Sequence, residues 1–483
     1  MLIRVSSQSS VRLRACFNQL LLVILINVPT VSFGLAMGWV SLASGETAEA
    51  EETGDMGEVV VAAGTTFLAS LLGVPLSACA LAAGRKVAVI ATSSCFVVCW
   101  SLKLVGHGWW LVGARMAAGL GGAGAWSVAP LLAREMCSVR VRGAAVAALV
   151  LAHNLGILLM YLAAGVELHH RTVLWWCLGL SLAHCLVFLL MPESPAFLAS
   201  RGRMKEARAA LLWLRGSPTA AEGMAALALE LAALPLPLAT KFLSPFQRAK
   251  HMLSDGRRRR AFAICAVAVV GQEMCGVMAL LQFAERVFVL ARDEGLAPTD
   301  SPGVELVSPA GHAVLLGVVQ LLASAVALYL IEKIGRRPLL VACAYATGLC
   351  LLGGAGAVWW GARTWAAWAL AGAVAADSMG LQPVPYSLLA DCFAYEFRAC
   401  ALMLVTALGC IGNTTEIFTF AALAASQGVA AALLLAAALT LAYSVFVSFA
   451  VPETKNKTLD QIYDSIGPDS SDSKHPHSAT TYV

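Results

Sequence analysis

The chain alternates long apolar runs with short polar intervals. Each apolar run is close to or longer than the roughly 20 residues that a membrane-spanning helix needs. Six runs precede the longest polar interval, at residues 15–45, 59–84, 87–105, a fourth that ends at Ala133, 143–166 and 172–192. Six more follow it, at residues 261–284, 306–331, 338–362, 364–390, 399–423 and 429–451. The pattern predicts an all-α polytopic membrane protein with twelve transmembrane helices in two six-helix halves.

The polar interval at residues 193–260 holds 12 of the 33 Lys and Arg residues and only five acids. Short basic loops stay on the cytoplasmic side of a membrane, and 27 of the 33 basic residues share the side of this interval. We therefore expect both termini in the cytoplasm. The predicted units are a cytoplasmic N-terminus (1–14), a first half (15–192), a cytoplasmic linker with short helices (193–260), a second half (261–451) and a cytoplasmic tail (452–483), disordered after about residue 463.

Composition agrees with a membrane protein, because 59% of the residues are hydrophobic, 13% are charged and the mean hydropathy is +0.76. The 14 cysteines lie mostly inside apolar runs and have no zinc-ligand spacing, so we expect neither a disulfide framework nor a metal site. Neither a phosphate-binding glycine loop nor a nucleophile constellation is present. We expect no enzyme, no cofactor and no nucleic-acid partner, since the basic residues border the spans.

Three pairs of motifs in the same order indicate that the two halves repeat one another. Residues 84–86 (GRK) match 335–337 (GRR), and residues 192–194 (PES) match 452–454 (PET). Between them, Glu135 precedes Arg142 by the same seven residues that separate Asp391 from Arg398. Because each half has an even number of spans, the repeat is parallel, and a central cavity between the halves is expected.

The motifs also carry a family resemblance that extends from the first span to Ile462. They are residues 192–195 (PESP), 201–203 (RGR), 214–216 (LRG), 272–276 (QEMCG), 332–337 (EKIGRR), 380–386 (GLQPVPY) and 452–462 (PETKNKTLDQI). The chain resembles sugar porters of the major facilitator superfamily, in character closest to insect facilitated trehalose and hexose transporters. The resemblance implies a carrier that moves a sugar or related polyol across the plasma membrane by facilitated diffusion.

A carrier needs contacts that hold one gate closed in one state only. Charged residues at the cytoplasmic helix ends are the candidates, as salt bridges between the halves: Arg85, Glu135, Arg142, Glu332, Arg336, Arg337, Asp391 and Arg398. The first half lacks charges that the resemblance leads us to expect before Gly84, so its network should be the weaker one. Arg115 matches an outer-half arginine of the family, which implies a structural or gating role.

The candidate substrate residues combine retained and altered positions of the resemblance. Gln272 and Asn413 are retained, Gln282 and Gln382 are possible replacements, and Tyr386 stands where a tryptophan is expected. Val150 and Met278 replace an expected glutamine and asparagine, and Glu273 replaces the second glutamine of a pair. An unpaired sugar hydroxyl costs about 1 to 3 kcal/mol in a dry cavity, so we expect poor handling of glucose.

Two other functions remain open from the sequence. The chain could be a proton-coupled solute symporter in which Glu273 exchanges the proton, because ionisable residues inside membrane spans are functional candidates. It could also be a sugar-sensing paralogue that binds without transporting. The expected partners are a small sugar or polyol, the lipid bilayer and, in the symporter alternative, a proton.

Overall fold

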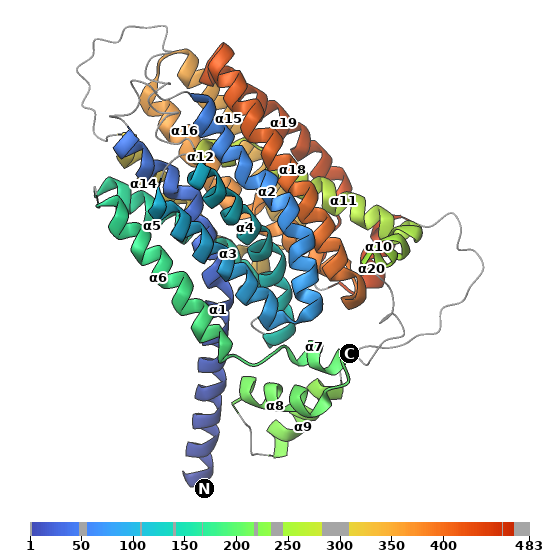
Figure 1. The fold of residues 1–483 in the computed structure, drawn as a ribbon. Helices are drawn as coiled ribbons and strands as arrows, with labels where there is room; N and C mark the ends of the chain where they lie inside the picture. The colour runs from blue at the N-terminus through green and yellow to red at the C-terminus, as the bar shows by residue number, and fades with distance from the viewer. Residues whose placement is uncertain are drawn as a thin grey trace.

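The computed structural model of the protein describes residues 2–47, 56–106, 109–138, 142–166, 168–216, 221–232, 245–282, 309–455 and 457–467. Every regular element in these ranges is helical (Figure 1). The helices of the first half are α1 (Leu2–Thr47), α2 (Met56–Ala83), α3 (Arg85–Val105), α4 (Trp109–Met136), α5 (Arg142–Gly165) and α6 (His170–Leu189). The linker contains α7 (Pro195–Ser200), α8 (Met204–Leu214), α9 (Ala221–Ala232) and α10 (Pro245–Ser254).

The second half and the tail follow the linker. Their elements are α11 (Gly256–Glu273), α12 (Val277–Gln282), α14 (Pro309–Ile334), α15 (Arg336–Trp359), α16 (Arg363–Ala376), η2 (Asp377–Leu381), α17 (Pro383–Cys392), α18 (Tyr395–Gln427), α19 (Val429–Ala450) and α20 (Leu459–Ile466). Within the described residues, 11 helical segments are long and apolar enough to span a membrane. A further crossing consists of α16, η2 and α17 in succession. The polytopic all-α fold predicted from the sequence is confirmed.

Two of the predicted spans are not continuous helices. The run at 261–284 stops at Glu273 and begins again at Val277, with Gly276 between them at a φ of +87°, a conformation that favours glycine. The run at 364–390 passes through the π-helical turn η2, just before Pro383 and Pro385. A proline lacks the backbone donor that a regular helix needs, so the regular ladder cannot continue through this stretch.

Two other predictions concern the loops and the tail. The predicted outer loop after the seventh span falls on residues 283–308, which lie outside the described residues. In the tail, Thr458 and Gln461 form a reciprocal capping box that starts α20, and the helix continues to Ile466. Helical structure therefore extends beyond residue 463, and residues 468–483 lie outside the described part of the chain.

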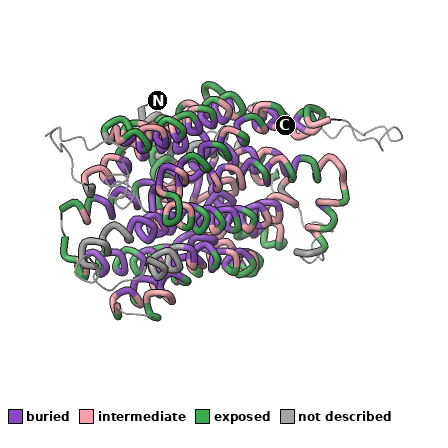
Figure 2. Tube along the Cα trace, turned by 90° about the horizontal axis from the view of Figure 1, so that it is seen from above, coloured by how far each residue is buried: buried purple, intermediate pink, exposed green. Residues whose placement is uncertain are grey.

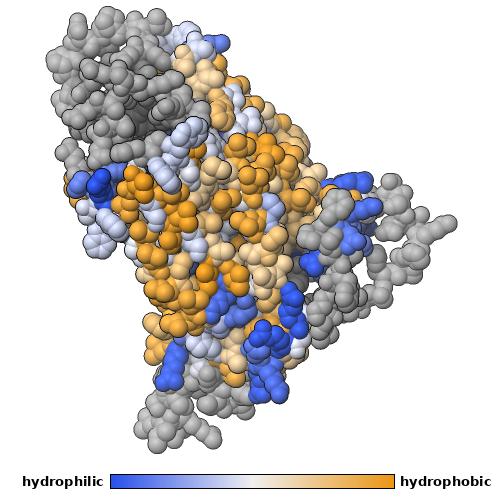
Figure 3. Space-filling model, in the orientation of Figure 1, coloured by the Kyte–Doolittle hydropathy of each residue, from blue (hydrophilic) through white to orange (hydrophobic). Residues whose placement is uncertain are grey.

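The outer surface of the bundle is apolar, whereas polar groups lie at its ends and inside it. Large apolar side chains such as Leu190 and Phe449 are exposed, and Figure 3 shows a broad hydrophobic band between polar ends. Buried residues lie toward the middle of the bundle (Figure 2). We call the end with α7–α9 and the α2–α3 turn the linker end, and the opposite end the far end (Figure 1). Exposed tryptophans, which favour membrane interfaces, gather at the far end: Trp109, Trp176, Trp360 and Trp365.

Glycines bring α1 and α5 into close contact in the first half. A Cβ atom added at Gly34 would clash with the carbonyl oxygen of His153, and one added at Gly156 would clash with the carbonyl oxygen of Val31. Small residues of this kind let helix backbones approach closely inside membranes. The contact fixes the position of His153, which faces the space between the halves.

Candidate functional site

The two halves enclose a narrow cavity in the middle of the bundle, with a volume of about 40 Å³. A single water molecule needs roughly 10 to 15 Å³ of such volume. The cavity therefore has room for a few water molecules and is too small for a sugar ring. The first half contributes the aromatic residues Phe33, Phe67 and Trp126 and the imidazole of His153. The cavity as it stands therefore has no room for a ligand of that size.

Several polar atoms in the cavity lining have no hydrogen-bond partner among the residues that the structure describes. These include the side-chain oxygens Oε1 of Gln272, Oγ1 of Thr406 and Oδ1 of Asn413. Among the described residues, neither ring nitrogen of His153 has a hydrogen-bond partner of strict geometry, although the ring interacts with the Thr30 backbone and packs against Phe33 and Trp126. An unpaired buried polar group costs about 1 to 3 kcal/mol. The lining therefore suits a ligand that supplies several hydrogen bonds to both halves.

Glu273 is the acidic residue of the cavity lining, at the C-terminal end of α11. Its Oε1 accepts a hydrogen bond from the Tyr386 hydroxyl at 3.1 Å, and its Oε2 accepts one from Asn413 Nδ2 at 2.6 Å. The side chain is buried, and no Lys or Arg belongs to the described residues of the lining. The carboxyl group is thus held by two neutral donors, at the point where the helix breaks.

Two further buried acids lie behind Glu273 in the second half. Asp377 accepts a hydrogen bond from Gln382 Nε2 at 2.8 Å. Glu416 Oε1 accepts one from the backbone N–H of Ala279 at 3.0 Å, in the first turn of α12. The first N–H groups of a helix have no intrahelical partner. Glu416 on α18 therefore caps the short helix that follows the break.

Contacts between the halves occur in the middle and at the far end of the bundle. In the middle, the rings of Trp126 and Tyr386 stack with centroids 5.2 Å apart. Asn154 Nδ2 lies 3.5 Å from Gln382 Oε1. At the far end, the Tyr161 hydroxyl donates a hydrogen bond to the carbonyl of Leu281 in α12. The helix capped by Glu416 thus contacts the first half at the far end.

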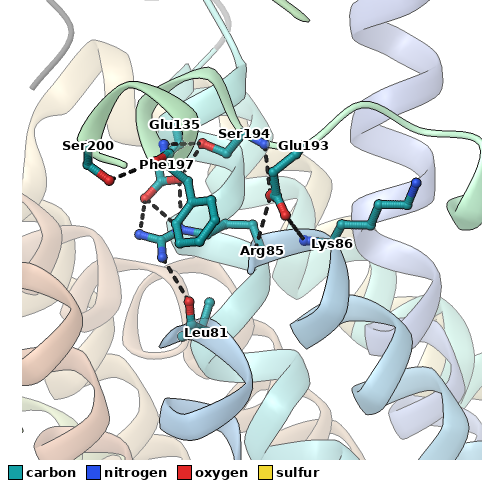
Figure 4. A network of polar contacts seen from close by, with 8 residues as sticks. All are labelled: Leu81, Arg85, Lys86, Glu135, Glu193, Ser194, Phe197 and Ser200. Atoms are coloured by element: carbon teal, nitrogen blue, oxygen red, sulfur yellow. Dashed lines mark hydrogen bonds and ion pairs between the residues drawn. The ribbon is translucent and has the colours of Figure 1, made fainter. Parts of the chain in front are cut away.

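A cluster of polar contacts lies at the linker end of the first half (Figure 4). Arg85 forms an ion pair with Glu135 at 2.8 Å, and the Ser194 hydroxyl donates to Glu135 at 2.5 Å. Glu193 accepts from the backbone N–H groups of Arg85 and Lys86, at 3.1 and 3.2 Å. These contacts tie the α2–α3 turn to the end of α4 and to the start of the linker.

The second half repeats this cluster with its matching residues. Arg336 pairs with Asp391 at 3.5 Å, and the Thr454 hydroxyl donates to Asp391 at 3.1 Å. Glu453 accepts from the backbone N–H groups of Arg336 and Arg337, at 3.1 and 3.2 Å. The repeat seen in the sequence thus extends to the side-chain contacts.

Glycine is required at the turn in both clusters. A Cβ atom added at Gly84 would lie 2.7 Å from Glu193 Oε2, and one added at Gly335 would lie 2.7 Å from Glu453 Oε2. The absence of a side chain lets each glutamate reach the backbone donors of the turn. Gly335 also has a φ of +109°, which L side chains rarely adopt.

One described ion pair joins the two clusters across the halves. Arg134 Nη1 lies 3.2 Å from Asp391 Oδ1. Among the predicted gating residues that the structure describes, Arg85 and Arg336 pair within their own halves, and Arg398 donates to the carbonyls of Ala390 and Phe393. Arg134, which the sequence-based selection missed, adjoins Glu135 in the same motif.

The expectation of a weaker first-half network stays a prediction. The Arg85–Glu135 pair measures 2.8 Å and the Arg336–Asp391 pair 3.5 Å, and Asp391 also contacts Arg134. In both halves a glutamate, Glu193 or Glu453, accepts a hydrogen bond from the backbone of the turn. The side chains of Arg142 and Glu332 lie outside the described part of the structure.

Arg115 lies near the far end and apart from the cavity. Its guanidinium donates to the carbonyl of Ala36 at 3.3 Å and lies 5.2 Å from the centroid of the Trp39 ring. The ammonium of Lys103 lies 4.1 Å from the same centroid and 4.6 Å from that of Trp100. This aromatic contact with buried cations connects α1, α3 and α4, so the position of Arg115 fits a structural role.

The structure brings together six of the eight predicted substrate residues. Those that line the cavity are Gln272, Glu273, Met278, Gln382, Tyr386 and Asn413. Val150 and Gln282 lie outside the lining; Val150 is buried in α5, and Gln282 contacts Met37 at the far end. One turn after Val150, His153 supplies the polar group that α5 presents to the cavity.

Sequence reasoning missed the aromatic wall of the cavity. Phe33, Phe67 and Trp126 lie in apolar runs, where an aromatic residue in the cavity has the same pattern as one that faces lipid. The nearest available signal was the glycine-rich stretch around Trp126, at residues 119–124, because small residues mark close helix contacts in the membrane.

The fold and the central cavity define a polytopic protein of the major facilitator type, with two repeated halves around one site. The family described as "Sugar (and other) transporter" matches residues 43–465, and the chain belongs to this family. Membership places the chain among transporters and not among enzymes.

Two curated relatives illustrate the similarity in sequence. The facilitated trehalose transporter Tret1 of Bombyx mori is 26% identical over 393 residues, which cover 78% of this chain and 73% of the relative. The probable polyol transporter 6 of Arabidopsis thaliana is 26% identical over 475 residues, which cover 91% of this chain and 92% of the relative.

Solved structures support the same fold. The proton:xylose symporter XylE bound to 6-bromo-6-deoxy-D-glucose aligns with a TM-score of 0.69 at 20% identity, over 92% of this chain and 98% of that one. The partially occluded, inward-open form of the xylose transporter XylE from E. coli aligns with a TM-score of 0.68 at 20% identity, over 90% of this chain and 99% of that one. At these identities the likeness concerns the fold alone.

Proposed function

We propose that this protein is a secondary carrier that moves a sugar or polyol through the central cavity by alternating access. The observation that carries the proposal is the set of unpaired polar atoms on His153, Gln272, Thr406 and Asn413, which come from both halves and line one cavity. A polyhydroxylated ligand supplies donors and acceptors to all of them. Relatives that are named trehalose and polyol transporters support this class of substrate.

Alternating access requires contacts that separate at one end while those at the other end stay closed. At the linker end the candidate is the Arg134–Asp391 ion pair, with Arg85 and Arg336 holding its two sides in place. At the far end the candidate is the contact between Tyr161 and α12. The described contacts join the halves at both ends, as in an occluded state of the cycle.

The orientation is part of the proposal. The basic linker and the charge clusters lie at one end and the exposed tryptophans at the other, so we place the linker end and both termini in the cytoplasm. The apolar outer surface would lie in the lipid bilayer. We assign the protein to the plasma membrane on the resemblance to facilitated sugar transporters.

A second function, proton-coupled symport, is favoured by the surroundings of Glu273. Burying a carboxylate charge is costly, and this side chain has two neutral donors and no basic partner within the described lining. Uptake of a proton removes the charge and weakens the hydrogen bonds from Tyr386 and Asn413. Proton binding would then be linked to the shape of the cavity wall.

Uptake of radiolabelled glucose, trehalose, xylose and sorbitol into vesicles that contain the purified protein tests both functions. The carrier function predicts saturable uptake of at least one compound above empty vesicles. Proton coupling predicts that an inward pH gradient raises this uptake and that Glu273→Gln abolishes the increase. Binding without uptake for every compound would contradict the carrier function and favour a sugar sensor. Uptake indifferent to the gradient would contradict the coupling.

A further inference from the structure

We infer that the preferred ligand of the cavity is a cationic amino sugar, in which a protonated amine binds Glu273 and hydroxyl groups bind the neutral polar residues. This inference rests on the proposed function, because it assigns a substrate class to the same cavity. The acidic side chain of Glu273 and several aromatic rings line the same cavity.

The carboxylate of Glu273 has unused capacity to accept hydrogen bonds. A carboxylate offers about four lone-pair sites, and the described contacts use two, from the Tyr386 hydroxyl at 3.1 Å and from Asn413 Nδ2 at 2.6 Å. Both donors are neutral, so the charge has no counter-ion within the described lining. A ligand ammonium group would supply donors and the missing positive charge together.

Aromatic rings adjoin the same carboxylate. Tyr386, which donates to Glu273, stacks on Trp126 with ring centroids 5.2 Å apart and an interplanar angle of 29°. Phe33 and Phe67 belong to the first-half side of the lining. A cation within about 6 Å of a ring centroid is attracted to its face, and such rings form the binding cages of ammonium ligands. The wall beside Glu273 therefore favours a cation over a neutral hydroxyl group.

Other acidic residues lie near Glu273 in the second half. Asp377 and Glu416 interact electrostatically with Glu273 from behind the cavity. The other titratable groups around Glu273 are His153 from α5, Tyr386 and the thiols Cys275 and Cys410. None of these is a permanent cation. The described surroundings of Glu273 in the second half thus contain further acidic groups and no Lys or Arg.

The remaining lining requires hydroxyl groups in the same ligand. Gln272, Thr406 and Asn413 each present an oxygen atom that has no partner in the described part of the chain, and His153 presents ring nitrogens from the opposite half. An ammonium ion without hydroxyls would leave these atoms unpaired. An amino sugar such as glucosamine supplies an ammonium group to the Glu273 carboxylate and hydroxyl groups to the unpaired polar atoms. Its N-acetylated form keeps the hydroxyl groups and loses the charge.

The experiment compares uptake of labelled glucosamine, N-acetylglucosamine and glucose into vesicles that contain the purified full-length protein, at a pH at which the amine is protonated. We expect glucosamine uptake efficiency to exceed that of the other two by on the order of tenfold or more, as for buried charge pairs. An inside-negative membrane potential should raise glucosamine uptake only. In Glu273→Gln the preference for glucosamine over N-acetylglucosamine should disappear.

A matched control is Asp377→Asn, which neutralises a buried acid outside the cavity lining and should keep the preference for glucosamine over its N-acetylated form. Ligand-dependent thermal stabilisation of the unmutated protein gives a second measurement that needs no variant, and glucosamine should stabilise it at lower concentration than glucose. Equal handling of glucosamine and glucose, or a preference that survives Glu273→Gln, would overturn the inference. If the inference fails in this way but neutral sugars are still transported, the proposed carrier function stands. If no sugar or amino sugar is transported, the carrier function and the amino-sugar inference are both refuted.

Discussion

The ion pair between Arg134 and Asp391 gives the sharpest mechanistic prediction, because it is the described salt bridge that joins the two halves. Arg134→Gln removes the charge and keeps most of the side chain. The two side chains are 20% and 22% exposed. Fully exposed pairs contribute about 0 to 1 kcal/mol, and hydrogen bonds to charged groups about 1.5 to 3 kcal/mol. A value near 1.4 kcal/mol for this partly buried pair corresponds to about a tenfold change in an equilibrium constant.

The assay measures the distance between spin labels at Lys86 in the first half and Lys333 in the second, both near the linker end. The variant should shift the population toward the long distance by about tenfold, because the pair forms only when this end is closed. Arg203→Gln is the matched control, since Arg203 pairs with Glu206 inside the linker. An unchanged distance distribution in Arg134→Gln, or an equal shift in Arg203→Gln, would refute this assignment of the gate.

The other predictions concern single contacts in the turn, the far end and the cavity. Gly335→Ala should lower the free energy of unfolding by about 1 to 3 kcal/mol, because the glycine has a φ of +109° and an added Cβ would lie 2.7 Å from Glu453 Oε2. Thermal unfolding in detergent measures this loss. Gly353→Ala is the control and should have little effect, because the added Cβ would meet open space. Glu416→Ala should leave the first turn of α12 uncapped and raise the labelling of a cysteine placed at Leu281. Glu416→Gln keeps an acceptor oxygen and should leave this labelling unchanged. Equal labelling in the two variants would count against the cap. Met278→Asn should raise glucose uptake, since Met278 lines the cavity, and Val150→Gln should not; the reverse order would show that the lining described here is not the substrate site. Arg336→Ala should lower transport with surface expression maintained, and normal uptake by this variant would contradict its part in gating.

The sequence was sufficient for the fold because a membrane leaves few alternatives. Long apolar runs must form helices that satisfy their own backbone, so the number of spans follows from their count. The exact positions of the two helix breaks were harder to predict. Gly276 and the prolines at 383 and 385 mark the breaks, but hydropathy treats each span as one segment, and the position of a break depends on partners such as Glu416, 137 residues away from Ala279 in the chain.

The site could be predicted only in part, for a related reason. Gln272, Glu273 and Asn413 are conspicuous as polar residues in apolar spans, and the structure brings them together. The aromatic residues of the first half carry no such signal. Arg134 was also missed, because its partner is fixed by the approach of two helices from different halves and not by any spacing along the chain.

Entrance counterflow tests the central claim of a carrier with an alternating cavity most directly. Vesicles that contain the purified protein are loaded with unlabelled sugar or polyol and diluted into a trace of the labelled compound. The account predicts a transient accumulation of label above equilibrium for at least one compound in the panel, and its loss in Asn413→Leu, which removes a polar group from the cavity. The absence of accumulation for every sugar, amino sugar and polyol, with folded protein in the vesicles, would contradict it.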